Sequence, residues 1–170
     1  DPRMTGRKLA REAMDNAGKT YPPVAFAMFA SPREEEQYIK GIQDIIGDLP
    51  MFGGSASDDH IVGEWKIIGN DKTFDDGCTI ALFYTTKDIK TVYDNTYEET
   101  ENMGIITLVD DERRIMEIDG IPALKKYAEW TGLNPDELMG QNLLRASISK
   151  PLAVKNLNGD LTLARHPKAG

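Results

Sequence analysis

Thiols and imidazoles are scarce in this chain of 170 residues, which contains one cysteine and two histidines. A single cysteine excludes a disulfide within the chain, a feature that fits a reducing compartment. We expect Cys78 to be a small buried hydrophobe and not a nucleophile, because it lies in the apolar run of residues 77–84. His60 and His166 are the only side chains available as imidazole bases.

Long apolar runs and an excess of positive charge are also missing. The longest unbroken apolar run covers residues 24–30, far too short to span a bilayer, and the N-terminus shows no basic stretch followed by an apolar one. Twenty basic residues against twenty-eight acidic ones give a net charge of −8, which repels nucleic-acid phosphates. The sequence therefore predicts a cytoplasmic protein with no nucleic-acid partner and no membrane insertion.

Apolar residues make up 40% of the chain, enough for one good core or two small domains. In the first half, helical spacing predicts a helix capped by Thr5, and the apolar residues 24–30 predict a central strand covered on both faces. Ser31, followed by proline and by glutamate at the third helical position, is typical of the start of a second helix. A short strand at Met51 would complete a strand-helix-strand unit with parallel pairing.

The rest of the chain predicts further strands and two helices. We expect, in order, strand segments at 61–62, 65–68 and 72–74, the last two forming a hairpin around the break at residues 69–71, and then strands at 78–84 and 89–97. A hairpin at 104–118, two helices from Pro122 and a final hairpin turning at Asn158-Gly159 should follow. The acidic stretch 97–102 lacks periodicity and predicts a boundary between domains 1–98 and 99–170. The expected fold is mixed α/β (α+β), with mixed sheets, packed helices and two closely associated units.

The two ends of the chain suggest a segment of a longer protein. The chain begins with Asp1-Pro2, without an initiator methionine, and stops soon after the last hairpin pattern.

One stretch, residues 49–59, is the candidate binding site. An apolar run there ends in paired glycines, two hydroxyl side chains and two carboxylates, a pattern that predicts a loop whose backbone approaches a ligand closely. Successive N–H groups of such a loop can form an anion-binding nest. The predicted parallel pairing puts the loop at a strand's carboxyl end, where ligands bind in open α/β sheets. The predicted ligand-binding residues are Gly53, Gly54, Ser55, Ser57, Asp58 and Asp59.

Other interpretations of this stretch compete with ligand binding. A tight turn explains paired glycines without any ligand. Asp58-Asp59-His60 has metal-capable side chains, but three adjacent residues on an extended loop seldom point at one centre, so a solvated acidic loop is favoured. Gly53 to Ser57 approximates a nucleophile elbow, which would make Ser55 the nucleophile of a serine hydrolase, yet Ser57 replaces the final glycine. We therefore expect a protein that is not an enzyme, with no cofactor and no metal site.

The order of the motifs resembles a known family. A strand ending in Ala30-Ser31-Pro32, the helix around residues 38–42, the stretch 49–59 and the strand at 77–82 together resemble the N-terminal FIST domain. Residues 114–127 resemble the start of the C-terminal FIST module, whose hairpin, Asp-Gly, Pro-Ala and tyrosine recur here in that order.

The resemblance implies an intracellular sensory module of a signalling protein that binds a small ligand, such as an amino acid or a related metabolite. Its partners would be that small-molecule ligand and a signalling output domain or partner protein outside this chain. For an amino-acid zwitterion, we expect the glycine amides with Ser55 and Ser57 to meet the carboxylate, and Asp58 or Asp59 to meet the amino group. A purely structural interaction domain is the third alternative.

Overall fold

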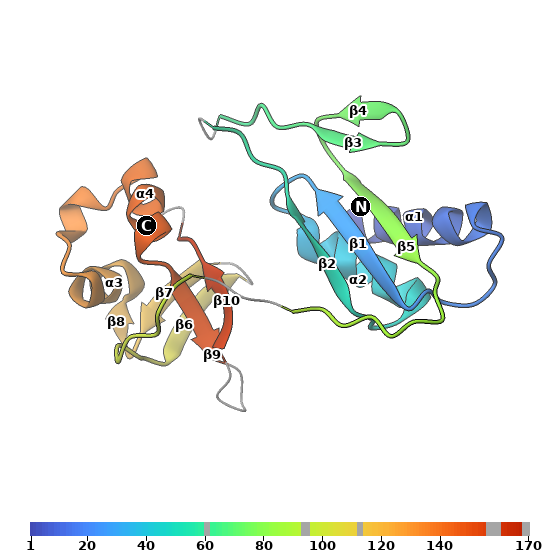
Figure 1. Cartoon of the computed structure of the whole chain (residues 1–170). Helices are drawn as coiled ribbons and strands as arrows, with labels where there is room; N and C mark the ends of the chain where they lie inside the picture. Colours follow the sequence, from blue (N-terminus) through green and yellow to red (C-terminus); the bar gives the residue numbers. More distant parts are fainter. Residues whose placement is uncertain (60–61, 93–95, 112–113, 156–160, 168–170) are drawn as a thin grey trace. The chain divides into compact units, whose positions relative to one another are not determined.

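The computed structural model describes residues 1–59, 62–92, 96–111, 114–155 and 161–167. These form two compact units, 1–93 and 94–170 (Figure 1). Both units mix helices with strands, so the predicted mixed α/β class is confirmed. None of the described helices is long and apolar enough to cross a membrane.

The described residues of the first unit form two helices and five strands. In chain order they are α1 (Pro2–Asn16), β1 (Ala25–Ala30), α2 (Glu35–Ile46), β2 (Met51–Ser55), β3 (Ile67–Gly69), β4 (Lys72–Phe74) and β5 (Cys78–Phe83). The second unit has β6 (Ile106–Asp111), β7 (Arg114–Ile118), β8 (Ile121–Pro122), α3 (Ala123–Thr131), the 3-10 helix η1 (Pro135–Glu137), α4 (Gln141–Ser149), β9 (Leu152–Lys155) and β10 (Leu161–Arg165).

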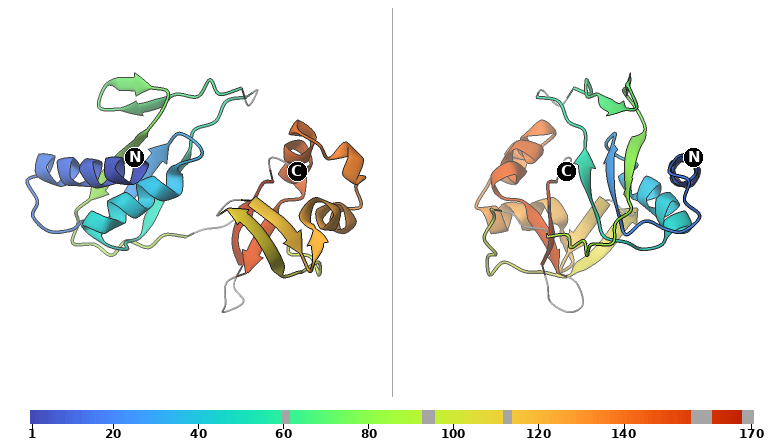
Figure 2. Two further views of the ribbon diagram at one scale, coloured as in Figure 1. Left: turned by 180° about the vertical axis from the view of Figure 1, so that it is seen from behind. Right: turned by 45° about the vertical axis from the view of Figure 1, so that its right-hand side comes forward.

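The main sheet of the first unit has the order β2-β1-β5. β1 pairs in parallel with β2 and antiparallel with β5, so the predicted central strand and the predicted strand-helix-strand unit are both confirmed. Helices α1 and α2 pack against one face of this sheet (Figures 1 and 2). Phe26, Ile42 and Tyr38 form the centre of that core, each with at most 4% of its surface exposed.

The other face of the sheet is partly open, which differs from the expectation of a strand covered on both sides. Along β1, Phe26 and Met28 belong to the core on the helical side, whereas Phe29 is 53% exposed. On the neighbouring strand Phe52 is 49% exposed, and its ring lies 5.5 Å from that of Phe83. Because strand side chains alternate between faces, these phenylalanines form an apolar surface opposite the helices.

Two glycines set the distance between α1 and α2. A Cβ atom built on Gly6 would lie 2.4 Å from the carbonyl oxygen of Tyr38, and one built on Gly41 would lie 2.1 Å from that of Arg3. Both glycines are buried. The two helices therefore touch through their backbones, which any larger side chain at these positions would prevent.

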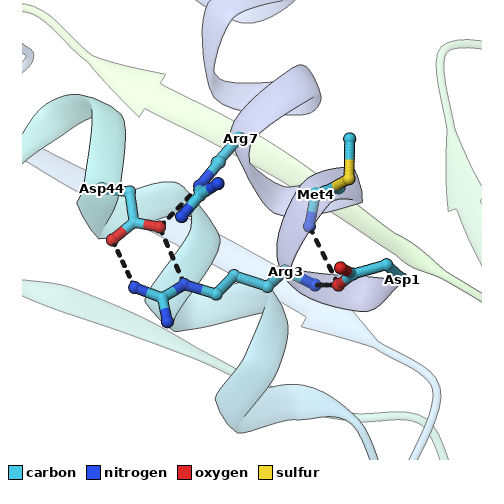
Figure 3. Close-up of polar contacts among 5 residues, drawn as sticks. All are labelled: Asp1, Arg3, Met4, Arg7 and Asp44. Carbon is cyan, nitrogen blue, oxygen red and sulfur yellow. Dashed lines mark hydrogen bonds and ion pairs between the residues drawn. The ribbon is translucent and has the colours of Figure 1, made fainter.

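A charged cluster joins the same two helices (Figure 3). Arg3 donates to both oxygens of the Asp44 carboxylate at 2.8 Å, and Arg7 donates to one of them at 2.7 Å. Hydrogen bonds from Arg3 and then from Arg7 hold the pKa of Asp44 well below its ordinary value of 3.8. The cluster thus links an N-terminal turn of α1 to the last turns of α2.

Both helix starts differ from the predicted ones. The N-cap of α1 is Asp1, whose carboxylate accepts from the amides of Arg3 and Met4, so the helix begins before Thr5. Ser31 does not cap α2. Its buried hydroxyl donates to Asp76 at 2.7 Å and accepts from the Gly77 amide at 3.0 Å, which ties the end of β1 to the start of β5.

The predicted hairpin over residues 65–74 is confirmed as the β3–β4 pair. Asn70 and Asp71 both have positive φ, 47° and 63°, as a type I′ turn requires. The hairpin begins at the buried Ile67. Of the strand predicted at 61–62, Val62 lies in a bend and its neighbour lies outside the described residues.

The second unit contains the sheet β6-β7-β8 and the separate hairpin β9–β10. The hairpin predicted at 104–118, the two helices after Pro122 and the pairing of the last two strands are confirmed, whereas the turn at Asn158-Gly159 lies outside the described residues. No strand forms in the described part of 89–97. The core of this unit consists of Tyr127, Ala128, Leu138 and Leu143.

Hydrogen bonds hold the segment before β6 to the helices of the second unit, to which this segment belongs. The Tyr97 hydroxyl donates to the carbonyl oxygen of Ile148 at 2.8 Å, and the Asn102 side chain donates to that of Trp130 at 3.2 Å. Residues 84–92, by contrast, form neither helix nor strand.

Candidate ligand-binding site

The paired glycines lie within β2 and not in the loop after it. Gly54 pairs with Phe29 and Ser55 with Ala30 across the parallel ladder. Along a strand, successive amides point to opposite sides, so these residues do not form the nest of convergent N–H groups that we predicted. The predicted placement beside the carboxyl end of a parallel strand is confirmed.

The two glycines have different structural roles. Gly53 has φ +145°, and a Cβ atom there would lie 1.8 Å from the carbonyl oxygen of Met28, so only glycine fits. A Cβ atom on Gly54 would meet nothing within 4 Å. Gly53 therefore allows β2 to approach β1, and Gly54 leaves the surface above it open.

A pocket of about 430 Å³ lies at this open surface. Its lining consists of Phe29, Gly53, Gly54, Ser55, Ala56, Lys66, Ile67 and Ile68. Three of the six predicted site residues thus line one pocket, together with the end of β1 and the start of β3. Its volume lies within the range of about 300–1,000 Å³ that is usual for small-molecule sites.

Ser55 has one polar group on the helical side of the sheet and one at the edge of the sheet. Its hydroxyl donates to Glu35 at 2.5 Å, and the same carboxylate accepts from the Arg33 amide at 2.7 Å. Because the next amide, that of Ala56, donates to Ala30 across the ladder, the amide of Ser55 points to the outer edge of the sheet. That amide is a hydrogen-bond donor beside the pocket.

The remaining predicted residues, Ser57, Asp58 and Asp59, are not among the residues that line the pocket. The carboxylate of Asp58 accepts from three backbone amides, those of Val62, Gly63 and Glu64, at 2.8 to 3.1 Å. It therefore organises the loop between β2 and β3. Asp59 is exposed on the same loop.

A scan against protein-family models matches residues 1–121 to the FIST N domain. The chain belongs to the FIST family. No curated protein and no solved structure matches it. FIST domains are sensory domains of signal transduction.

The FIST N match covers the whole first unit and continues through β6 and β7 to the first residue of β8. Every residue that lines the pocket lies within it. The similarity of residues 114–127 to the C-terminal FIST module stays a prediction.

Outside the candidate stretch 49–59, sequence reasoning missed four lining residues of this FIST domain: Phe29, Lys66, Ile67 and Ile68. The sequence predicts Phe29 in a strand covered on both faces, and it predicts the other three residues in a hairpin without indicating a role in binding. One sequence feature could have indicated these residues: a predicted β hairpin follows the glycine stretch closely. That β3 lies next to β2 is visible only in the tertiary structure.

Lys66 is the charged residue in the pocket lining, and it forms an ion pair with Asp75. The indole nitrogen of Trp65 donates to the backbone carbonyl of Asp75 at 2.8 Å. Both bonds hold the segment before β3 against the segment after β4. No group of three metal-ligating side chains occurs among the residues that the structure describes.

Proposed function

We propose that this FIST chain is a sensory module that binds a small ligand in the pocket between β2 and β3. The ligand is a small carboxylate, either an amino acid or a related metabolite, and the output is an attached signalling domain or a partner protein outside this chain. One observation carries the proposal: the glycine-containing strand β2 of this FIST domain lines a pocket. Gly53, Gly54 and Ser55 of that strand form one side of the pocket.

The lining suits such a ligand. Phe29, Ile67 and Ile68 supply apolar surface, and Lys66 supplies a positive charge at the same pocket. Binding sites for small metabolites combine a largely apolar wall with a few polar groups that fix orientation. The Ser55 amide at the edge of β2 is such a group.

We propose further that the module is not an enzyme. A serine nucleophile needs a base that takes its proton, usually histidine. Ser55 lies in a strand instead of at a strand-helix elbow, and its hydroxyl donates to the Glu35 carboxylate. Of the two histidines, His166 is bonded through Nδ1 to the carbonyl oxygen of Ser147 in the second unit, and His60 lies outside the described residues.

A thermal-shift screen of amino acids and small carboxylates tests the proposal. A ligand at one hundred times its dissociation constant stabilises the folded state by about 2.7 kcal/mol, which raises the melting temperature by several degrees. Gly54→Val should abolish the shift, because its side chain enters the pocket and meets no neighbour within 4 Å of its Cβ.

Ala81→Val is the matched control, since it adds the same methyl groups at an exposed strand position that does not line the pocket. A shift that survives Gly54→Val in a folded variant would place the site elsewhere. A fluorophosphonate probe should leave Ser55 unlabelled; labelling that Ser55→Ala removes would favour the hydrolase. A screen without any hit would favour a structural interaction domain.

A further inference from the structure

We infer that the pocket selects a carboxylate with an apolar body and no ammonium group, and that Lys66 is the side chain that binds the carboxylate. The inference rests on the proposed function, because it concerns the same pocket. It replaces the zwitterion expected from the sequence with a simpler anion. The charged side chains around the pocket differ in how firmly the protein itself engages them.

Two carboxylates that contact β2 or the loop after it, those of Glu35 and Asp58, are engaged by the protein itself. Asp58, expected to meet an amino group, accepts from three backbone amides and is not among the residues that line the pocket. Glu35 accepts from the Ser55 hydroxyl and from the Arg33 amide. The ammonium group of an amino acid would have to lose its hydration without gaining a carboxylate from the described lining, which is unfavourable.

A ligand carboxylate can replace Asp75 as the partner of Lys66 in its ion pair. The side chain of Lys66 is 59% exposed and that of its partner Asp75 is 71% exposed. Ion pairs between exposed side chains contribute little to stability, and the long lysine side chain rotates freely. A ligand carboxylate in the pocket can therefore take the place of Asp75, with the Ser55 amide as a second donor at the edge of β2.

The other lining residues indicate that the part of the ligand beyond its carboxylate is apolar. Phe29 and Ile68 are more than half exposed, so contact with an apolar group removes their surface from water. Ile67 and the open surface above Gly54 continue the apolar wall. A short branched alkyl chain matches this combination better than a polar one.

Three probes with the same branched alkyl chain test the inference by calorimetric titration: 4-methylpentanoate has only the carboxylate, leucine has the carboxylate and the ammonium group, and 3-methylbutylamine has only the ammonium group. We expect 4-methylpentanoate to bind most tightly, leucine at least several-fold more weakly, and the amine not at all. Lys66→Met keeps the length of the side chain without its charge. It should weaken 4-methylpentanoate binding by about tenfold or more, the effect of losing one charge-assisted hydrogen bond.

Two further variants sharpen the test. Asp75→Asn removes the competing carboxylate, so it should strengthen 4-methylpentanoate binding several-fold. Lys72→Met, in the adjacent strand β4 and not among the lining residues, should change nothing. Tighter binding of leucine than of 4-methylpentanoate, an unaffected Lys66→Met variant, or weaker binding by Asp75→Asn would each overturn the inference. The proposed function would survive those results, and would fail only if Gly54→Val left the binding of every hit unchanged or if no hit existed.

Discussion

Replacing Gly41 with alanine sets two physical effects against each other. Alanine stabilises a helix by about 1 kcal/mol relative to glycine when no neighbour interferes. At this position, however, the new Cβ atom would lie 2.1 Å from the Arg3 carbonyl oxygen and 3.1 Å from the Arg7 amide nitrogen. Both are backbone atoms of α1, so no side chain can rotate away and the helices must separate.

The steric effect should outweigh the helix propensity. Overpacking of a core costs about 1–3 kcal/mol, and separating α1 from α2 also loosens the contacts of Ile42 and Tyr38 in the same core. We expect a net loss of about 1–2 kcal/mol. For a unit of this size each kcal/mol changes the melting temperature by about 4–8 °C, so the transition of the first unit should fall by about 5–15 °C.

Differential scanning calorimetry measures this change, and two variants control it. Gly54→Ala, whose Cβ atom meets nothing within 4 Å, should leave the melting temperature nearly unchanged. Gly6→Ala should act like Gly41→Ala, and the double variant should cost less than the two single effects together, because one separation of the helices relieves both clashes. A melting temperature that rises in Gly41→Ala, as propensity alone requires, would refute the backbone contact between α1 and α2.

Two further predictions concern stability and the boundary between the units. Because its folded-state pKa is depressed, Asp44 contributes stability that is present above its unfolded value of 3.8 and is lost as the pH falls toward the folded value. Asp44→Asn should therefore lower the urea midpoint at pH 7, and the difference from the parent should shrink below pH 4; a constant difference would contradict the role of the ion pairs. Trypsin should cut first at the exposed Lys87 or Lys90, where no helix or strand forms, and yield two resistant fragments; mass spectrometry showing a first cut within β7 would contradict the division.

Most elements could be predicted because their signals are local. Apolar residues without polar interruption indicated the central strand β1, and Asn70-Asp71 between two short strands indicated the β3–β4 hairpin, whose turn has the expected positive φ angles. The class of fold and the parallel β1–β2 pair follow from this order of elements.

The wrong predictions concern residues whose side chains bond to distant parts of the chain instead of to their sequence neighbours. Ser31 and the following proline look like a helix cap, but the serine hydroxyl bonds to Asp76 and Gly77, more than forty residues away. The positive φ of Arg33, 102°, then delays the helix until Glu35. A sequence pattern contains no information about such distant partners.

The candidate site could also be predicted only in part, because its residues depend on contacts between distant parts of the chain. Paired glycines predicted a loop, because glycine is usually a strand breaker. In the structure, the close approach of β2 to Met28 makes glycine necessary inside the strand at position 53. Lys66 could not be recognised as a candidate, since its place in the pocket depends on how the hairpin packs beside β2.

The burial of the lone cysteine makes the pocket open to selective chemical labelling. Cys78 is 6% exposed, and burial raises the pKa of its thiol to about 12, so the reactive thiolate form is scarce at neutral pH. Gly54→Cys would introduce an accessible thiol directly beside the pocket, at a position with room for a side chain. A fluorophore attached there would report occupancy of the pocket in the otherwise native chain, without prior removal of Cys78.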